Sequence, residues 1–176
     1  SVQDLFRKSL ANGDIYLGTY EGWYCANESF RTATDVTETA AGTICPNHPE
    51  VPLQWLTERN WFFRLSAYQE RLERHYADHP DFVQPDFRRN EMLGFIRQGP
   101  QDVSLSRRRQ KWGDAVPWGT DQVICVWFDA LLNYYTALGY GREGEDLTDE
   151  YWPAFHILAK DILKFHAIYW PAFLMA

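Results

Sequence analysis

The stretch Val123-Ile-Cys-Val-Trp-Phe-Asp-Ala-Leu-Leu-Asn-Tyr-Tyr-Thr-Ala-Leu138 contains two different patterns in direct succession. Its first four residues form a mostly β-branched apolar run, which is typical of a strand buried on both faces. A helix is predicted to follow at once and to end at Gly139 or Gly141. Its apolar residues recur at helical spacing and fall on one face: Trp127, Ala130, Leu131, Tyr134 and Leu138.

The same order of patterns recurs further along the chain. Ala154-Phe-His-Ile-Leu158 is typical of a second short buried strand, and a helix opened by Asp161 is predicted after it. This helix carries its large apolar residues and one imidazole on one side: Ile162, Phe165, His166, Tyr169 and Phe173. Strand, helix, strand and helix in this order predict an α/β fold with a parallel sheet.

The composition limits the class of protein. With 176 residues, 45% hydrophobic and 16% aromatic, the chain is expected to form one globular domain or slightly more. Its net charge of −7 excludes a dedicated nucleic-acid-binding protein with a basic footprint. No apolar run reaches the roughly 20 residues of a membrane span, so we expect no membrane partner. Because residues 170–176 stop inside an apolar pattern without a helix cap, we expect a fragment.

One segment is basic within this acidic chain. Between Gln84 and Lys111, seven cations stand against three anions. This segment is the one candidate surface for a polyanion, and an ordinary solvated face explains the same pattern equally well. The candidate nucleic-acid-binding residues are its clustered cations: Arg88, Arg89, Arg107, Arg108, Arg109 and Lys111.

The two predicted strand-to-helix junctions suggest a binding site. Ligands in parallel α/β sheets bind at the carboxyl ends of the strands. His166 and Trp170 are four residues apart and share a helical face, which would meet the Tyr134 face of the first helix. The resulting aromatic pocket suits a flexible apolar side chain, and its rings favour sulfur. The alternative is that this stripe only packs the core. Asp161 has two interpretations as well, a helix N-cap or a ligand of ribose hydroxyls.

The three cysteines cannot form a closed disulfide framework, and this odd count favours a reducing compartment. Cys45 and His48 have the short spacing that lets two side chains chelate one zinc ion, and Cys25 is a possible third ligand. A closed structural site needs four ligands, and Glu28 stands where a second cysteine of a CxxC pair would be. Since carboxylates seldom complete structural zinc sites, the pattern favours a vacant knuckle, and zinc is not expected.

Six motifs in register resemble the methionyl-tRNA synthetases, a family of class I aminoacyl-tRNA synthetases, and together they cover essentially the whole chain. They are Tyr20-Glu-Gly-Trp-Tyr-Cys25, Asn60-Trp-Phe-Phe-Arg-Leu65, Arg89-Asn-Glu, Ser104-Leu-Ser-Arg107 with Lys111-Trp-Gly113, Val126-Trp-Phe-Asp-Ala-Leu-Leu-Asn-Tyr134 and Lys160-Asp-Ile-Leu-Lys-Phe-His-Ala-Ile-Tyr-Trp-Pro171. The resemblance implies a Rossmann-like parallel sheet, present in part, with an inserted α+β connective-peptide subdomain. On this template, residues 1–19 end the first Rossmann half, 20–112 form the insertion and the return from it, and 113–176 begin the second half.

The resemblance also implies a set of site residues. The corner Ala159-Lys160-Asp161 would meet the adenosine of ATP, although Ala159 stands where the family usually has glycine. The residues implied to line the methionine pocket match the faces found from spacing: Trp127, Ala130, Leu131, Tyr134, Ile162, His166 and Trp170.

The implied complete enzyme is a ligase that activates methionine with ATP and Mg²⁺ and transfers it to its tRNA. The phosphate-binding signatures His-Ile-Gly-His and Lys-Met-Ser-Lys-Ser do not occur in these 176 residues. We therefore expect no catalytic residue in this chain and no activity from it alone. The degenerate knuckle and the His-Ala-Ile-Tyr-Trp-Pro motif resemble mitochondrial or bacterial members, which implies the mitochondrial matrix or, alternatively, a bacterial cytoplasm. The rival interpretation is a non-catalytic protein derived from the insertion domain. It would be either a binding module that contacts the tRNA acceptor stem through residues 88–111 or a scaffold without a ligand.

Overall fold

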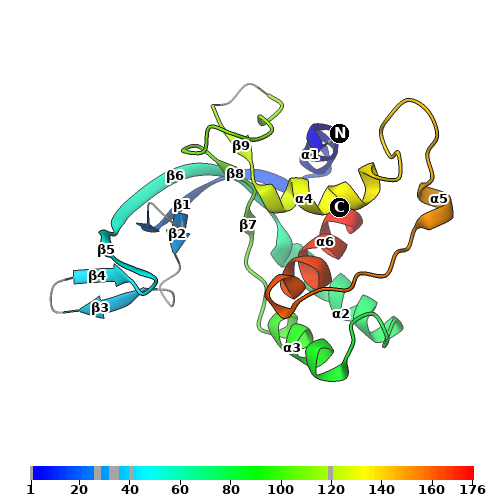
Figure 1. The fold of residues 1–176 in the computed structure, drawn as a ribbon, viewed down its shortest axis with the longest axis horizontal. Helices are drawn as coiled ribbons and strands as arrows, with labels where there is room; N and C mark the ends of the chain where they lie inside the picture. The colour runs from blue at the N-terminus through cyan, green and yellow to red at the C-terminus, as the bar shows by residue number, and fades with distance from the viewer. Residues whose placement is uncertain (1, 26–28, 32–35, 40–41, 119–120) are drawn as a thin grey trace. The chain divides into compact units, whose positions relative to one another are not determined.

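The computed structural model describes the whole chain except residues 1, 26–28, 32–35, 40–41 and 119–120. The chain forms two compact units, which we call the body and the arm. The body comprises Ser1–Tyr16 and Trp61–Ala176, and the arm comprises Leu17–Asn60. As Figure 1 shows, the chain enters the arm along strand β1 and leaves it along strand β6.

The arm consists of strands. These are β1 (Ile15–Cys25), β2 (Ser29–Arg31), β3 (Thr37–Thr39), β4 (Gly42–Cys45), β5 (His48–Pro52) and β6 (Gln54–Phe63), of which β1 begins and β6 ends in the body. One sheet has the order β2-β1-β6-β7, and a second has the order β3-β4-β5. The β4–β5 hairpin pairs Cys45 with His48, so the two candidate metal ligands face each other across its turn.

The body contains short strands and most of the helices. Its strands are β7 (Val103–Ser104), β8 (Ser106–Arg107) and β9 (Val123–Ile124). Its α-helices are α1 (Val2–Ala11), α2 (Gln69–Asp78), α3 (Asp86–Arg97), α4 (Val126–Thr136), α5 (Thr148–Tyr151) and α6 (Trp170–Met175). Two 3₁₀-helices, η2 (Leu65–Tyr68) and η3 (Lys160–Ile162), and one π-helix, η4 (Phe165–Tyr169), complete the set.

The predicted α/β class is confirmed, but the two predicted strands differ from expectation. Only Val123 and Ile124 form a strand, and this strand pairs antiparallel with β8. Residues 154–158 form no strand, and the side chains of Phe155 and Ile157 are fully exposed. A strand buried on both faces needs paired strands at its edges and side chains packed over both faces, and the described residues provide no paired strand for this segment. The prediction of a buried strand there is therefore wrong for this chain.

The helix predicted from Asp161 onward is present but irregular. It begins as η3, passes through the π-turns of η4 and ends as α6. Ala159, not Asp161, holds the N-cap position, and no side chain caps the first turn. The predicted N-cap role of Asp161 is therefore wrong, and its side chain is exposed.

One apolar core organises the body. Phe6 of α1 packs against Phe128 of α4, with ring centroids 5.3 Å apart, and Phe128 packs against Phe173 of α6. Figure 1 shows α4 and α6 side by side with α1 near both. The core therefore fixes α4 against the C-terminal helices, the elements that carry the predicted pocket. None of the helices within the described ranges is long and apolar enough to cross a membrane.

Candidate functional site

Helix α4 presents two different faces. Phe128, Leu131 and Leu132 point into the core. Trp127, Ala130 and Tyr134 are only half-buried, so they form a separate, more accessible face. Leu131, also predicted to line the pocket, lies in the core with 1% of its surface exposed. The predicted stripe is therefore split between a packing role and a surface that a ligand can reach.

His166 of η4 connects the C-terminal helical segment to this accessible face of α4. Its Nε2 atom lies 2.8 Å from the Tyr134 hydroxyl, and its Nδ1 atom lies 3.0 Å from the Ile162 carbonyl oxygen. A carbonyl oxygen only accepts hydrogen bonds, so Nδ1 of the ring carries the proton. In the neutral ring Nε2 then accepts from the Tyr134 hydroxyl. This chain of bonds fixes three predicted pocket residues relative to one another.

Aromatic rings surround this polar pair. Trp127 stacks on Phe165 with centroids 3.8 Å apart and planes 10° apart, and thus links α4 to η4. Trp170 lies 6.4 Å from the Tyr134 ring and is almost completely buried. Its indole Nε1 is buried without a hydrogen-bond partner among the described residues. The predicted faces of α4 and of the C-terminal helical segment therefore meet, and aromatic rings lie around the Tyr134–His166 pair.

Two further rings belong to the cluster and were not predicted. His156 lies 4.4 Å from the Tyr134 ring and 5.8 Å from the His166 ring, and Trp152 lies 6.1 Å from the Trp170 ring. Burial, followed by the charge of His166, lowers the pKa of His156. In the sequence, His156 is an imidazole inside an apolar run. Because this run was interpreted as a buried strand, His156 was not considered as a site residue.

The predicted nucleotide corner is open to solvent. Ala159, Lys160 and Asp161 are all exposed at the start of η3. The Ala159 carbonyl oxygen accepts a hydrogen bond from the backbone N–H of Ile162 at 3.3 Å. Since Asp161 does not cap the helix, its carboxylate is free to meet a ligand hydroxyl. Asp161, the last residue of the corner, lies five residues before His166 in the same helical segment.

Several predicted nucleic-acid-binding cations have partners inside the chain. Arg88 pairs with Glu91, and Arg108 pairs with Asp121 at 2.8 Å. Arg89 donates to the Tyr76 carbonyl oxygen at 3.1 Å. These contacts reduce the charge that the segment presents to a polyanion. Arg107 donates a hydrogen bond to the Ser104 hydroxyl oxygen. The side chains of Arg109 and Lys111 are exposed.

The candidate metal ligands come together in the arm. One donor atom each from Cys25, Cys45 and His48 lies within 4.8 Å of the other two. Both thiols are buried, and the Cys45 Sγ atom lies 4.0 Å from His48 Nδ1. The spacing fits three corners of a tetrahedral zinc site. Glu28, the candidate fourth ligand, lies outside the described residues.

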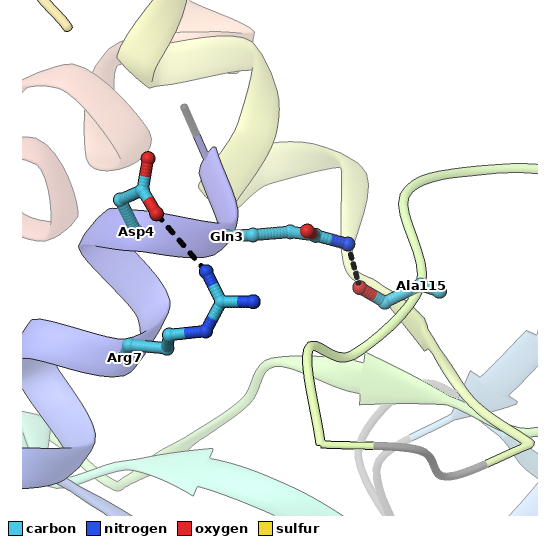
Figure 2. Close-up of polar contacts among 4 residues, drawn as sticks. All are labelled: Gln3, Asp4, Arg7 and Ala115. Carbon is cyan, nitrogen blue, oxygen red and sulfur yellow. Dashed lines mark hydrogen bonds and ion pairs between the residues drawn. The ribbon is translucent and has the colours of Figure 1, made fainter.

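A separate cavity of about 250 Å³ lies between α1 and α4. Helical spacing puts its α4 residues on the side away from Trp127 and Tyr134. Burial, followed by the charge of Asp114, raises the pKa of Asp129 at this cavity. Figure 2 shows the adjoining contact, in which the Gln3 amide donates to the Ala115 carbonyl oxygen at 2.8 Å. The lining residues are Val2, Gln3, Asp114, Asp129, Leu132, Asn133 and Thr136.

Comparison with known proteins identifies relatives over the whole chain. The family model described as tRNA synthetases class I (M) matches residues 31–176. A methionine–tRNA ligase of Thermosynechococcus vestitus is 49% identical over 180 residues, which is 99% of this chain and 34% of that protein. A methionine–tRNA ligase of Thermotoga maritima is 44% identical over 100% of this chain and 28% of its own length.

A solved structure is also similar to this chain. Mycobacterium tuberculosis methionyl-tRNA synthetase in complex with methionyl-adenylate superposes with a TM-score of 0.86 at 43% identity. The match covers 99% of this chain and 34% of that chain. The chain thus spans about a third of the length of the relatives it matches.

Proposed function

The chain belongs to the class I methionyl-tRNA synthetases, and on that premise we propose that it is the part of the enzyme that holds the methionine side chain. In the proposed reaction, the complete enzyme activates methionine with ATP to methionyl-adenylate. It then transfers the methionyl group to the terminal adenosine of its tRNA. The family resemblance predicted from six sequence motifs agrees with the comparisons.

The observation that supports this role is the contact between Tyr134 and His166 inside a ring of aromatic side chains. A methionine side chain is flexible, apolar and polarisable, and sulfur–aromatic contacts contribute roughly 0.3–1.5 kcal/mol each. We propose that Trp127, Ala130, Ile162 and Trp170 supply the apolar contacts. The Tyr134–His166 pair holds the two walls at a fixed separation, so the pocket is organised before methionine arrives.

The nucleotide and nucleic-acid contacts are finer proposals. We propose that Asp161 accepts hydrogen bonds from ribose hydroxyls of ATP, because its carboxylate is exposed and does not cap η3. Mg²⁺ accompanies ATP in the complete enzyme, and we assign it no residue of this chain. The tRNA acceptor stem is proposed to meet residues 88–111, where Arg108, Arg109 and Lys111 are among the exposed cations.

The organisation and location of the complete protein are proposals as well. We propose that residues 20–112 are the connective-peptide insertion with its return, between the ends of two Rossmann halves. The resemblance of the knuckle and of the His-Ala-Ile-Tyr-Trp-Pro motif favours the mitochondrial matrix, with a bacterial cytoplasm as the alternative.

Methionine-dependent exchange of pyrophosphate into ATP tests the proposed function. The complete protein that contains this chain should catalyse the exchange with methionine and not with leucine. The 176 residues alone should catalyse none, because the phosphate-binding signatures lie outside them. A complete protein without methionine-dependent exchange would contradict the assignment. Exchange by the 176 residues alone would show that the chemistry resides here after all.

A further inference from the structure

Tyr76 is a fully buried residue that connects helix α2 to η4, the segment that carries His166. It lies in α2 with no exposed surface, and its hydroxyl donates to the Ala167 carbonyl oxygen at 2.8 Å. Burial raises the pKa of Tyr76, so the phenol keeps its proton and remains a donor at every working pH. The contact joins positions 91 residues apart in the chain.

The acceptor of this bond lies in the π-helix η4, directly after His166. A π-turn contains one more residue than an α-turn, so it is rare and is kept where neighbouring structure holds it in place. The extra residue sets the direction in which the His166 ring points. In a regular α-helix, a change of one residue in register rotates a side chain by about 100° around the axis.

Tyr76 is itself held from the other side. Arg89 of α3 donates to the Tyr76 carbonyl oxygen at 3.1 Å, and the Phe82 ring packs edge-on against the Tyr76 ring at 5.3 Å. Helices α2 and α3 pack together, and α3 also contacts η4. The hydroxyl therefore reaches η4 from a rigid support.

We propose that Tyr76 is a positioning residue for the methionine pocket, because its hydroxyl holds the π-turn that presents His166 to Tyr134. This inference rests on the proposed function of the pocket. Without the hydroxyl, the Ala167 carbonyl oxygen loses its buried donor, and η4 relaxes toward α-helical register. His166 then turns away from Tyr134, and the two walls of the pocket lose their polar link.

Kinetics of the Tyr76→Phe variant of the complete enzyme test the proposal. The substitution removes one oxygen atom and keeps the ring. The KM for methionine should rise about fivefold to tenfold, as loss of one buried hydrogen bond predicts. The KM for ATP should stay within about twofold of the wild-type value.

Tyr68→Phe is the matched control. Tyr68 is also buried, and its hydroxyl donates to Asp14 at 2.6 Å, away from η4. This variant should lose thermal stability to a similar extent without a specific effect on methionine. If Tyr76→Phe leaves the KM for methionine unchanged in an active enzyme, or raises both KM values equally, the proposal is wrong.

The ¹⁵N signal of the His166 ring gives a readout that does not require activity. In the structure, the His166 Nδ1 atom donates to the Ile162 carbonyl oxygen, and the Nε2 atom lies 2.8 Å from the Tyr134 hydroxyl. Tyr76→Phe should shift the Nε2 signal, Tyr68→Phe should not, and loss of a signal in His166→Gln gives the assignment. If the wild-type protein fails to activate methionine, the proposed function is wrong. The ¹⁵N signal of His166 then still shows whether the Tyr76 hydroxyl positions the His166 ring. An unchanged signal in that case overturns the proposal.

Discussion

The body and the arm are stabilised in different ways. The body buries a continuous set of large side chains, among them Phe6, Phe63 and Phe128, each with at most 1% of its surface exposed. In the described part of the arm, the buried apolar side chains are those of Cys25 and Cys45, two of the three candidate metal ligands. The arm therefore depends on its strand pairing and on the state of these thiols, whereas the body depends on apolar burial.

This difference fits the location of the proposed methionine pocket in the body. A binding site needs side chains held within a fraction of an ångström, and close-packed cores provide that rigidity. Tyr134 packs against the core cluster to which Phe128 and Phe173 belong. The arm places Trp55 on its surface, with 57% exposed, and offers no comparable support. Substitutions in the two units should therefore differ strongly in their effects.

The largest expected effect comes from a cavity in the body. Phe128→Ala should lower the free energy of unfolding by about 3–5 kcal/mol, because the ring is buried among other rings. Trp55→Ala in the arm should cost less than about 1 kcal/mol, since that ring is largely exposed. Denaturant unfolding of both variants measures the two values. Equal losses would mean that the arm contributes to the same cooperative core.

The zinc content of the protein tests whether a metal ion cross-links the strands of the arm. The described residues supply three of the four ligands of a structural zinc site, so we expect less than one zinc ion per chain after dialysis. Removal of zinc by a chelator should leave the melting temperature of the body unchanged. Cys45→Ser should abolish residual binding, and Cys125→Ser, which alters a cysteine outside the site, should not. One tightly held zinc ion per chain would show that Glu28 or water completes the site.

A smaller effect is expected from the pH dependence of stability. Burial of Asp102 favours its neutral form, but hydrogen bonds from Ser66 and Tyr16 outweigh this and lower the pKa of the carboxyl. A carboxyl whose pKa is lowered in the folded state stabilises the protein above its unfolded-state pKa, about 4. That stabilisation is lost as the pH falls through the folded-state pKa. Asp102→Asn should therefore lower the melting temperature at pH 7 and have little effect near pH 2.

The exposed Asp149 provides the control for this measurement. Asp149→Asn should change the melting temperature little at either pH. If Asp102→Asn lowers stability equally at pH 7 and pH 2, the effect comes from packing and not from the charge of the carboxylate.

The sequence predicted the helical elements of the body well, because amphipathic periodicity reports which face is buried. Apolar residues at a spacing near four predict a helix over 65–76, and the structure has η2 followed by α2 there. A second helix predicted from Asn90 is α3, which begins earlier, at Asp86. Ser66 would be expected to cap the first of these helices, but it does not. Its hydroxyl and backbone N–H bind Asp102 instead, a partner 36 residues away that local sequence cannot reveal.

The site was predictable in its helical faces and not in its details. Spacing alone placed His166 and Trp170 on one face, and the structure brings both to Tyr134. Spacing did not reveal that Leu131 belongs to the core, because adjacent faces of α4 are both apolar. It also gave no sign of the π-turn at His166, where the Ala167 carbonyl oxygen accepts a hydrogen bond from the distant Tyr76 hydroxyl.

The central claim is that the aromatic face of α4 and η4 holds the methionine side chain, and Trp170→Ala in the complete enzyme tests it most directly. The change removes aromatic surface beside Tyr134, so kcat/KM for methionine should fall at least about tenfold, while the KM for ATP stays nearly unchanged. The melting temperature of the same variant separates binding from packing, because Trp170 also contacts the core. A large loss of stability with equal effects on methionine and ATP would contradict the pocket assignment.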